Sequence, residues 1–339
     1  MQNLGYACMN MTLSSRPKKT RVTTNRSMIR RTFDERGIQY ASELALQNCI
    51  DLRKILEWNE NIGIKFYRLS SNIFPWASEY NLSDLPHYTR IAEVLADCGD
   101  FAARHGHRLT SHPGPFNKLT SPKEQVVLNT IRDLEIHGEV FDLLGLSRTP
   151  YNKINIHVGA TYGDKPMAVD NFCNNFYRLS DAVRSRLTVE NDDKGVLYTV
   201  EDLYNMIHSR IDIPIVFDYH HHSLLPGNQT EQEALTMALS TWDGIKPVVH
   251  YSESRREEHN SDCKPQAHSD FIYNRINDYN NDIDIMVEAK MKELAVLQYL
   301  NLNFARMVEL AYTRDLKSLD RKVLRVRIPL RVLGGRTYV

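Results

Sequence analysis

The stretch IPIVFDYHHHS, residues 213–223, is an apolar run that stops at an aspartate and continues into three histidines. Short runs rich in Ile, Val and Phe are typical of buried strands. A solvent-exposed turn would favour Gly, Asn or Ser at that point, whereas this chain places Asp218 and the histidines 220–222 there. Ionisable side chains directly after a buried strand indicate a chemical site at that edge of the sheet.

Seven more short β-rich runs alternate with segments of helical periodicity along the chain. They are NLGYAC (3–8), KFYRLS (65–70), HRLTSH (107–112), KINIHVG (153–159), SRLTVEND (185–192), KPVVHYS (246–252) and DIDIMVEA (282–289). Eight strand–helix units in about 310 residues predict a parallel sheet closed into an α/β (β/α)8 TIM barrel. A doubly wound open sheet is the alternative, but it normally has a glycine-rich phosphate turn after its first strand, and GYACMN is not one.

Three of the segments between the strands carry clear helix signals. Residues 41–61 place their apolar side chains roughly on one stripe, and residues 122–145 begin with a proline in the first turn. Residues 230–240 start from Thr230 with Glu233 three positions on, which is the pattern of a capping box. These segments support the alternation of strand and helix.

Positive charge is concentrated in two segments, although the chain as a whole is neutral. Residues 8–40 and 314–336 each carry eight Lys or Arg against two acidic residues. We interpret 8–40 as a basic loop inserted after the first strand of a single barrel domain, 1–313, and 314–339 as a basic C-terminal tail. Basic segments on an acidic body predict a polyanionic partner, and solvated loops are the alternative interpretation.

Composition and the N-terminal sequence favour an intracellular protein with no membrane segment. No apolar run approaches the ~18 residues of a membrane span, and the first residues lack the charged and apolar regions of a secretory signal. The five cysteines are odd in number and scattered without a CxxC motif. That usage is typical of free thiols in a reducing compartment.

Side chains of metal-binding type stand at the C-terminal ends of the predicted strands, where TIM barrels carry their active sites. One such residue alone would be explained as a hydrogen-bonded core histidine or a helix N-cap, but six of the eight strands end this way. Several carboxylates placed close together repel one another unless cations lie between them. The candidate metal ligands are His112, His157, Glu190, Asp218, His221, His250, His268 and Glu288.

This ligand set also indicates the kind and number of ions. Mixed His and carboxylate ligands suit Zn²⁺, Mn²⁺ or Fe²⁺ better than Mg²⁺ or Ca²⁺. Eight ligands are too many for one ion, so we expect two or three, with a carboxylate such as Glu190 bridging two of them. Closely spaced ions stabilise the attacking and leaving oxygens at phosphorus, and the basic segments suit a phosphodiester substrate.

Eight motifs together resemble, in order and spacing, those of the UV-damage endonuclease (UvdE) family. They are LGYACMNMTL, YRLSSNIFPWAS, SHPGPF, IHVGATYGDK, VENDDK, FDYHHH, KPVVHYSES and IMVEAKMKE, between residues 3 and 293. The resemblance implies a TIM barrel with a cluster of divalent metal ions, Mn²⁺ first and Zn²⁺ as the alternative. It implies a DNA repair endonuclease that nicks the strand directly 5′ of UV photolesions by metal-hydroxide attack on the phosphodiester.

The resemblance also implies the substrate and the setting. The expected lesions in double-stranded DNA are cyclobutane dimers and 6-4 products, with abasic sites as an extension. We expect a monomer in the cytoplasm or nucleoid, or in the host cell if the source is a virus.

Carried over residue by residue, the resemblance divides the ligands among three ions. The first ion is assigned His112, His157 and Glu190. The second, with the residues expected to be catalytic, is assigned Glu190, Asp218, His250 and Glu288. A third, more exposed ion is assigned His221 and His268. Asn191 and His222 are expected to support these ligands from behind. The resemblance assigns nothing to His220, which we interpret as a packing or solvated residue.

Residues outside the metal cluster are expected to contact DNA. Tyr6 matches the family's tyrosine at the lesion, and Phe116 matches an aromatic residue that probes the duplex beside the HPG turn. Pro115 stands where the family usually has glutamine, so an amide contact to the opposite strand is lost. Expected phosphate contacts in the basic loop are Lys18, Lys19, Arg21, Arg30 and Arg31.

Two further positions depart from the family pattern. Val248 stands where some members have a lysine near the metals, and Asn72 stands where at least one bacterial member has histidine. Both departures affect the surroundings of the ions and not the ligands themselves. The alternative functions are an abasic-site endonuclease, a metal-dependent TIM-barrel sugar isomerase and a damage-binding protein without catalysis.

Overall fold

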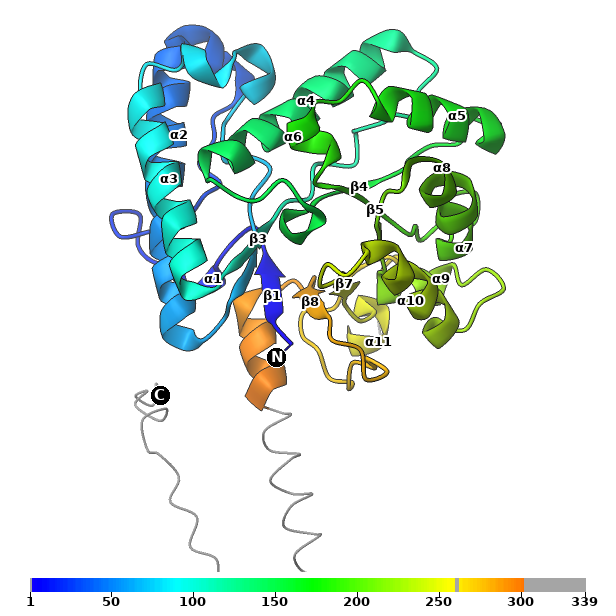
Figure 1. The fold of residues 1–339 in the computed structure, drawn as a ribbon. Coiled ribbons are helices and arrows are strands. Elements are labelled where there is room, and N and C mark those ends of the chain that lie inside the picture. Colours follow the sequence, from blue (N-terminus) through cyan, green and yellow to red (C-terminus); the bar gives the residue numbers. More distant parts are fainter. Residues whose placement is uncertain (1, 260–261, 302–339) are drawn as a thin grey trace, which may run out of the picture. The chain divides into compact units, whose positions relative to one another are not determined.

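Eight parallel strands form the centre of the fold within the residues that the computed structural model describes, 2–259 and 262–301 (Figure 1). They are β1 (Leu4–Ala7), β2 (Phe66–Arg68), β3 (Arg108–Thr110), β4 (Ile154–His157), β5 (Leu187–Glu190), β6 (Ile215–Val216), β7 (Val248–Tyr251) and β8 (Asp284–Val287). Each lies inside one of the eight stretches predicted from the sequence.

The strands close into a ring. Ladders join them in the orders β3-β2-β1-β8-β7 and β4-β5-β6. Two isolated parallel bridges connect these sheets, Ser111 with Ile154 and Asp218 with His250. The prediction of a closed TIM barrel is therefore confirmed, and the open-sheet alternative is wrong.

A small apolar layer fills part of the barrel interior. It consists of the buried residues Ala7, Phe66, Val216, Trp242, Val248 and Met286. Gly5 makes room for it, because a Cβ at this position would lie 2.6 Å from the Phe66 ring. Side chains two residues apart on a strand share a face. The strand residues two positions after those of this layer therefore also point inward, at the C-terminal end of the barrel.

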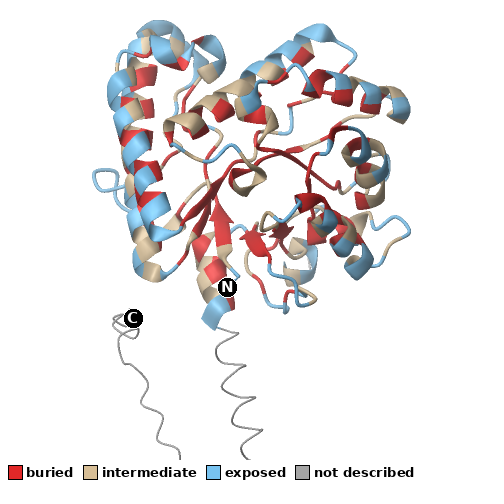
Figure 2. Cartoon of the chain, viewed as in Figure 1, coloured by how far each residue is buried: buried red, intermediate tan, exposed pale blue. Residues whose placement is uncertain are grey.

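Helices cover the outside of the barrel, and buried residues gather on the strands and on the helix faces toward them (Figure 2). The described α-helices are α1 (Met11–Ser14), α2 (Arg30–Ile62), α3 (Tyr88–His105), α4 (Glu124–Leu143), α5 (Lys165–Phe176), α6 (Asp181–Arg184), α7 (Val200–Asp202), α8 (Ser209–Ile211), α9 (Tyr219–Leu224), α10 (Glu231–Leu239) and α11 (Arg255–His259). Another helical stretch is described from residue 293 to 301. No described helix is long and apolar enough to cross a membrane.

The predicted helix signals are present with one change of boundary. Thr230 and Glu233 form the expected capping box of α10, with both reciprocal hydrogen bonds. Helix α2 begins at Arg30 and bends at Gly37, which has a φ of 62°. The insertion after β1 therefore covers residues 8–29 and not 8–40. The predicted domain end at 313 and the basic tail, 314–339, lie outside the described residues.

Candidate metal centre

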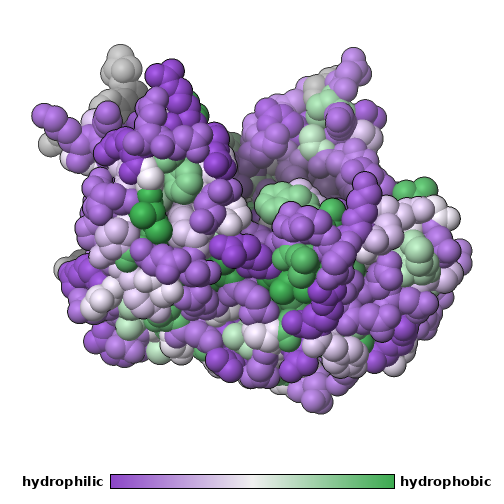
Figure 3. Space-filling model, turned by 90° about the horizontal axis from the view of Figure 1, so that it is seen from above, coloured by the Kyte–Doolittle hydropathy of each residue, from purple (hydrophilic) through white to green (hydrophobic). Residues whose placement is uncertain are grey.

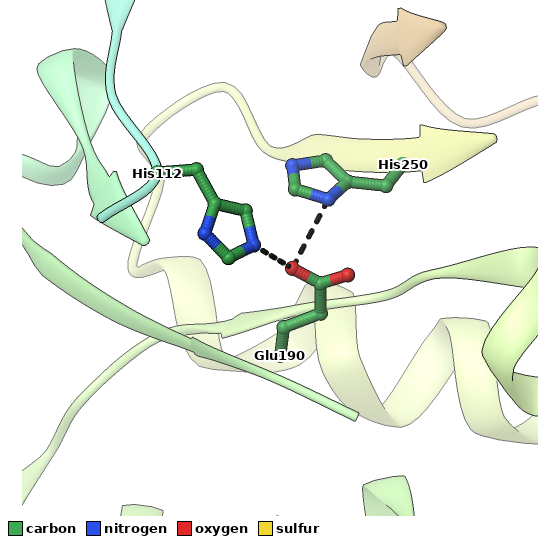
Figure 4. A group of neighbouring side chains, drawn as sticks. All are labelled: His112, Glu190 and His250. Carbon is green, nitrogen blue, oxygen red and sulfur yellow. Dashed lines mark hydrogen bonds and ion pairs between the residues drawn. The ribbon is translucent and has the colours of Figure 1, made fainter. Parts of the chain in front are cut away.

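The carboxylate of Glu190, at the end of β5, is the centre of the candidate site (Figure 4). Its Oε2 lies 3.0 Å from Nε2 of His112 and 3.1 Å from Nδ1 of His250. Its Oε1 lies 3.3 Å from Nδ1 of His221. Three histidines from different parts of the barrel thus surround one fully buried carboxylate.

The charge state of Glu190 follows from these neighbours. Burial raises the pKa of the Glu190 carboxyl, but His250, His157 and the hydrogen bonds from His112 and His221 outweigh burial and hold it well below its usual range. For His250, burial lowers the pKa to about 4. At neutral pH the Glu190 carboxylate is therefore ionised and the His250 imidazole is neutral, which are the protonation states that bind metal.

A second group of ligands lies next to the same ring nitrogen of His250. The Nδ1 of His250, which faces Glu190, is also 3.2 Å from Oε1 of Glu288, and Glu288 pairs with Arg68. Asp218 caps helix α9 by accepting a hydrogen bond of 2.8 Å from the backbone N–H of His221. Burial, together with the charges of Glu190 and Glu288, raises the pKa of Asp218 to about 7. A bound cation would relieve this repulsion between carboxylates.

His157, at the end of β4, completes the ring of ligands. Its Nδ1 lies 3.0 Å from Oδ1 of Asp192, and its ring centroid is 5.4 Å from those of His112 and His221. Burial lowers the pKa of His157, but Glu190 and Asp192 outweigh burial and raise it.

The donor set fits divalent metal ions. Three groups at the barrel end each bring three ligand atoms within 4.8 Å of one another. They are His112–Glu190–His250, His157–Glu190–His221 and Asp218–His250–Glu288. Among the described residues, four buried ligand atoms make no well-aligned hydrogen bond, although three of them lie near a charged group: Nδ1 of His157, Oε1 of Glu190, Oδ2 of Asp218 and Nδ1 of His250. Unpaired buried polar atoms are costly, and cations held by these groups would give all four atoms a partner.

The grouping of the ligands differs from the predicted one. His221 joins His157 and Glu190, whereas the resemblance pairs it with His268. The Nε2 of His268 is 4.0 Å from Oε2 of Glu288, and its Nδ1 is 2.6 Å from Oγ of Ser252. His268 therefore stands at the edge of the cluster and outside the three groups.

Asn191 and His222, the two predicted supporting residues, have different surroundings. Asn191 accepts a 2.8 Å hydrogen bond from the backbone N–H of Asp218 and donates a 3.1 Å bond to its carbonyl. His222 packs against Phe217, with ring centroids 5.2 Å apart, and no contact with a ligand side chain is described for it. His220 is buried, 5.6 Å from the ring of His268, and is not solvated.

Three polar residues inside the barrel were missed by the sequence reasoning. Asn155 donates a short hydrogen bond to Glu190, and Nζ of Lys153 lies 2.9 Å from Nε2 of His250. Arg68 pairs with Glu288. Side chains alternate between the two faces of a strand, and this rule could have identified all three. Lys153 and Asn155 lie on the same inward face as His157, and Arg68 is the next residue after Phe66 on the inward face of its strand.

Tyr6 has a different place from the predicted one. It is fully buried, and its hydroxyl donates to Asn59 at 2.7 Å and accepts from Asn10 at 2.9 Å. Its ring lies 5.1 Å from that of Tyr67. A buried ring with both hydrogen bonds satisfied offers no exposed surface for stacking on a base in this structure, and the assignment of Tyr6 to the lesion stays a prediction.

The turn with Pro115 and Phe116 is exposed as a probing element requires. Pro115 lies on the surface, and the Phe116 side chain is 70% exposed. The Phe116 ring folds over Gly114, where a Cβ would lie 2.4 Å from it. A groove of about 550 Å³ beside this turn is lined by Phe116, Asn72 and Trp76, among others.

The five predicted phosphate contacts fall into two classes. Lys18, Lys19 and Arg21 are exposed in the loop after α1. Arg30 and Arg31 lie in the first turn of α2 and pair with Asp34 and Glu35, each at 2.8 Å. The loop residues keep their charge available to a partner, whereas the helix residues already have one.

Val248 belongs to the apolar layer beneath His250, so it provides no polar group to the metal centre.

The face toward which β1 points in Figure 1 is shown from above in Figure 3, with a hollow between raised, mostly hydrophilic sides.

The sequence and the fold are similar to those of known UV-damage endonucleases. The family model described as UV-endonuclease UvdE matches residues 2–319. A UV-damage endonuclease of Schizosaccharomyces pombe is 38% identical over 305 residues, which are 87% of this chain and 49% of that protein. A UV DNA damage endonuclease of Clostridium perfringens is 31% identical over 307 residues, with 88% and 70% covered. The chain spans about half the length of the fungal relatives that it matches.

Solved structures show the same relation. The crystal structure of SacUVDE has a TM-score of 0.76 and 30% identity, and the match covers 89% of this chain and 99% of that one. A 3-keto-D-glucoside 4-epimerase from E. coli has a TM-score of 0.51 at 12% identity, which shows a shared fold alone.

Proposed function

Since the chain belongs to the UV-endonuclease UvdE family, we propose that it nicks double-stranded DNA on the 5′ side of UV photolesions in a metal-dependent reaction. The observation that carries this proposal is the buried Glu190 carboxylate between His112, His221 and His250 at the C-terminal end of the barrel. Such a centre suits a phosphodiester, whose negative charge increases in the transition state.

The three ligand groups would hold two or three divalent ions, with Glu190 shared by two groups and His250 by two. The mixed imidazole and carboxylate ligands suit both Mn²⁺ and Zn²⁺. Mn²⁺ is the first choice because the resemblance to the UV-damage endonuclease family implies it, and Zn²⁺ is the second. Ions held there would lower the pKa of a water molecule and would stabilise negative charge on the phosphate oxygens.

The protein's own residues fix the geometry of this centre. Asn191 holds the backbone of Asp218, and Asn155 holds the carboxylate of Glu190. Arg68 neutralises part of the charge of Glu288 and sets its direction. Rigid ligands keep the ions and the phosphate in register, because a small displacement of a reacting group costs much of the rate.

Lesion recognition is assigned to the exposed turn. Phe116 inserts beside the damaged bases, since a cyclobutane dimer or a 6-4 product already weakens the stack at that step. Pro115 provides no amide, so this chain recognises the lesion through stacking more than through hydrogen bonds. Lys18, Lys19 and Arg21 contact phosphates, and we propose that the protein acts as a monomer inside the cell.

The test is a nicking assay on irradiated plasmid and on duplexes with one defined lesion. Glu190→Gln keeps the shape of the side chain and removes its charge, so nicking should fall below detection while binding to damaged duplex stays within several-fold. Glu139→Gln, which changes a partly buried glutamate on α4, is the matched control. Metal analysis of protein purified without chelator should give two or three ions per chain. Wild-type nicking by Glu190→Gln would remove the central carboxylate from the proposal, and wild-type protein that leaves irradiated plasmid intact would refute the proposal itself.

A further inference from the structure

Lys118 is a partly buried lysine two residues after the SHPGPF turn. Its stem lies across Gly159, two residues beyond His157. A Cβ on Gly159 would be 2.7 Å from Cδ of Lys118 and 3.0 Å from its Nζ. Gly159 also has a φ of 102°, which a side chain would strain. The loop after β4 is therefore shaped to leave room for this lysine.

Hydrogen bonds hold the backbone around Lys118 in place. Its N–H donates to Oγ1 of Thr130 at 2.9 Å, and that hydroxyl donates in turn to the carbonyl of Val126 on α4, also at 2.9 Å. The preceding residue, Asn117, donates to Oδ2 of Asp133 at 2.7 Å. The ammonium group is thus carried by an anchored stretch of backbone.

Lys118 has no described carboxylate partner, unlike other lysines of this chain. Lys54 and Lys165 pair with Asp51 and Asp202 at 3.0 and 2.9 Å. In the described part of the chain no ion pair joins Lys118 to an acidic residue, and the nearby Asp192 is already engaged with His157 at 3.0 Å. Burial lowers the pKa of Lys118, against the influence of Asp192. Keeping a partly buried ammonium without a partner is unfavourable, so an anion from outside is the missing group.

We propose that the ammonium group of Lys118 binds a non-bridging phosphate oxygen of the cut strand, next to the scissile phosphate. This inference rests on the proposed function and adds a substrate contact to it. The geometry favours the cut strand because the stem of Lys118 lies against the loop that directly follows His157. Phe116 lies two residues before Lys118, so one short stretch of the chain supplies both the stacking ring and a cation for the adjacent backbone. An ammonium–phosphate contact is charge-assisted and replaces condensed counterions.

The variant Lys118→Met keeps the length of the stem and removes the charge. We expect its affinity for duplex DNA at low salt to fall about tenfold, and the slope of log K against log salt to decrease by about 0.9. The loss should be equal for damaged and undamaged duplex, because a phosphate contact carries no lesion information. Metal content should not change. Lys118→Arg should keep most of the slope.

The matched control is Lys65→Met, which removes one positive charge one residue before β2, at the opposite end of the barrel. It should leave both affinity and slope unchanged. If Lys118→Met is folded, holds the wild-type amount of metal and has the wild-type salt slope, the inference is wrong. Binding to undamaged duplex separates this inference from the proposed function. If the salt slope of binding depends on Lys118 but the protein never nicks irradiated DNA, the phosphate contact is supported and the proposed nuclease activity is refuted. If the protein nicks irradiated DNA but the salt slope of Lys118→Met is unchanged, the nuclease activity is supported and the phosphate contact is refuted.

Discussion

Replacing Asn191 by alanine tests whether the centre depends on the support of its ligands. The side chain of Asn191 is almost fully buried and makes two hydrogen bonds, of 2.8 and 3.1 Å, to the backbone of Asp218. The Asp218 carbonyl keeps a second donor in the N–H of His222 at 3.0 Å, but no other acceptor is described for the Asp218 N–H.

The expected magnitude follows from these contacts. Leaving one buried N–H unpaired costs about 1–3 kcal/mol, and losing the second hydrogen bond costs about 1 kcal/mol, so the variant should lose ~3 kcal/mol of unfolding free energy. At about 2 °C per kcal/mol for a large domain, the Tm should fall by ~6 °C. Residues that orient a metal ligand are worth about 10- to 100-fold in metal affinity, so the Kd for Mn²⁺ should rise by that factor.

The assay combines thermal unfolding by circular dichroism with a Mn²⁺ titration of chelator-treated protein. Asn205→Ala, which changes an exposed asparagine of the π-helical stretch Leu203–His208, is the control and should leave both values unchanged. If Asn191→Ala melts at the wild-type temperature and binds Mn²⁺ with wild-type affinity, then Asn191 does not position Asp218. A normal Tm with weakened Mn²⁺ binding would show that the contact matters for the metals alone.

Four further predictions concern DNA and metal. Phe116→Ala should weaken binding to damaged duplex by about 10- to 100-fold, as one lost stacking contact predicts, in a gel-shift titration against undamaged duplex. Pro115→Gln should keep the metals and the cleavage step but change the ratio of nicking among a cyclobutane dimer, a 6-4 product and an abasic site, and an unchanged ratio would show that this position does not set lesion preference. Neutralising Lys18 and Lys19 together should flatten the salt dependence of binding by nearly two units of slope, whereas a constant slope would identify them as solvated residues. Dialysis against chelator should lower the Tm and abolish nicking, and Mn²⁺ should restore both, because ions that bind only the folded state stabilise it.

The sequence alone determined the architecture and most of the candidate ligands. Strand–helix alternation predicted the barrel because the repeat of apolar side chains, every 2 residues in a strand and every 3.6 in a helix, can be recognised in a short stretch of sequence. The strand-end position of Glu190 was enough to place it in the site, since the parallel strands of a barrel bring their C-terminal ends together. The capping box of Thr230 likewise depends only on residues close together in the sequence, and it is present in the structure.

Only the tertiary structure decided which of these side chains meet and which are buried. His221 joins the group of His157, and His268 stays at the edge, because the distance between loops depends on how both pack on the barrel. Tyr6 lies against Tyr67 in the interior, although its position in the sequence is equally compatible with the surface. The position of the Lys118 side chain likewise depends on the space left by Gly159, which is 41 positions away in the sequence. Periodicity fixes the face of a strand on which a residue stands, but partners that are distant in the sequence are fixed only when the closed barrel brings the loops together.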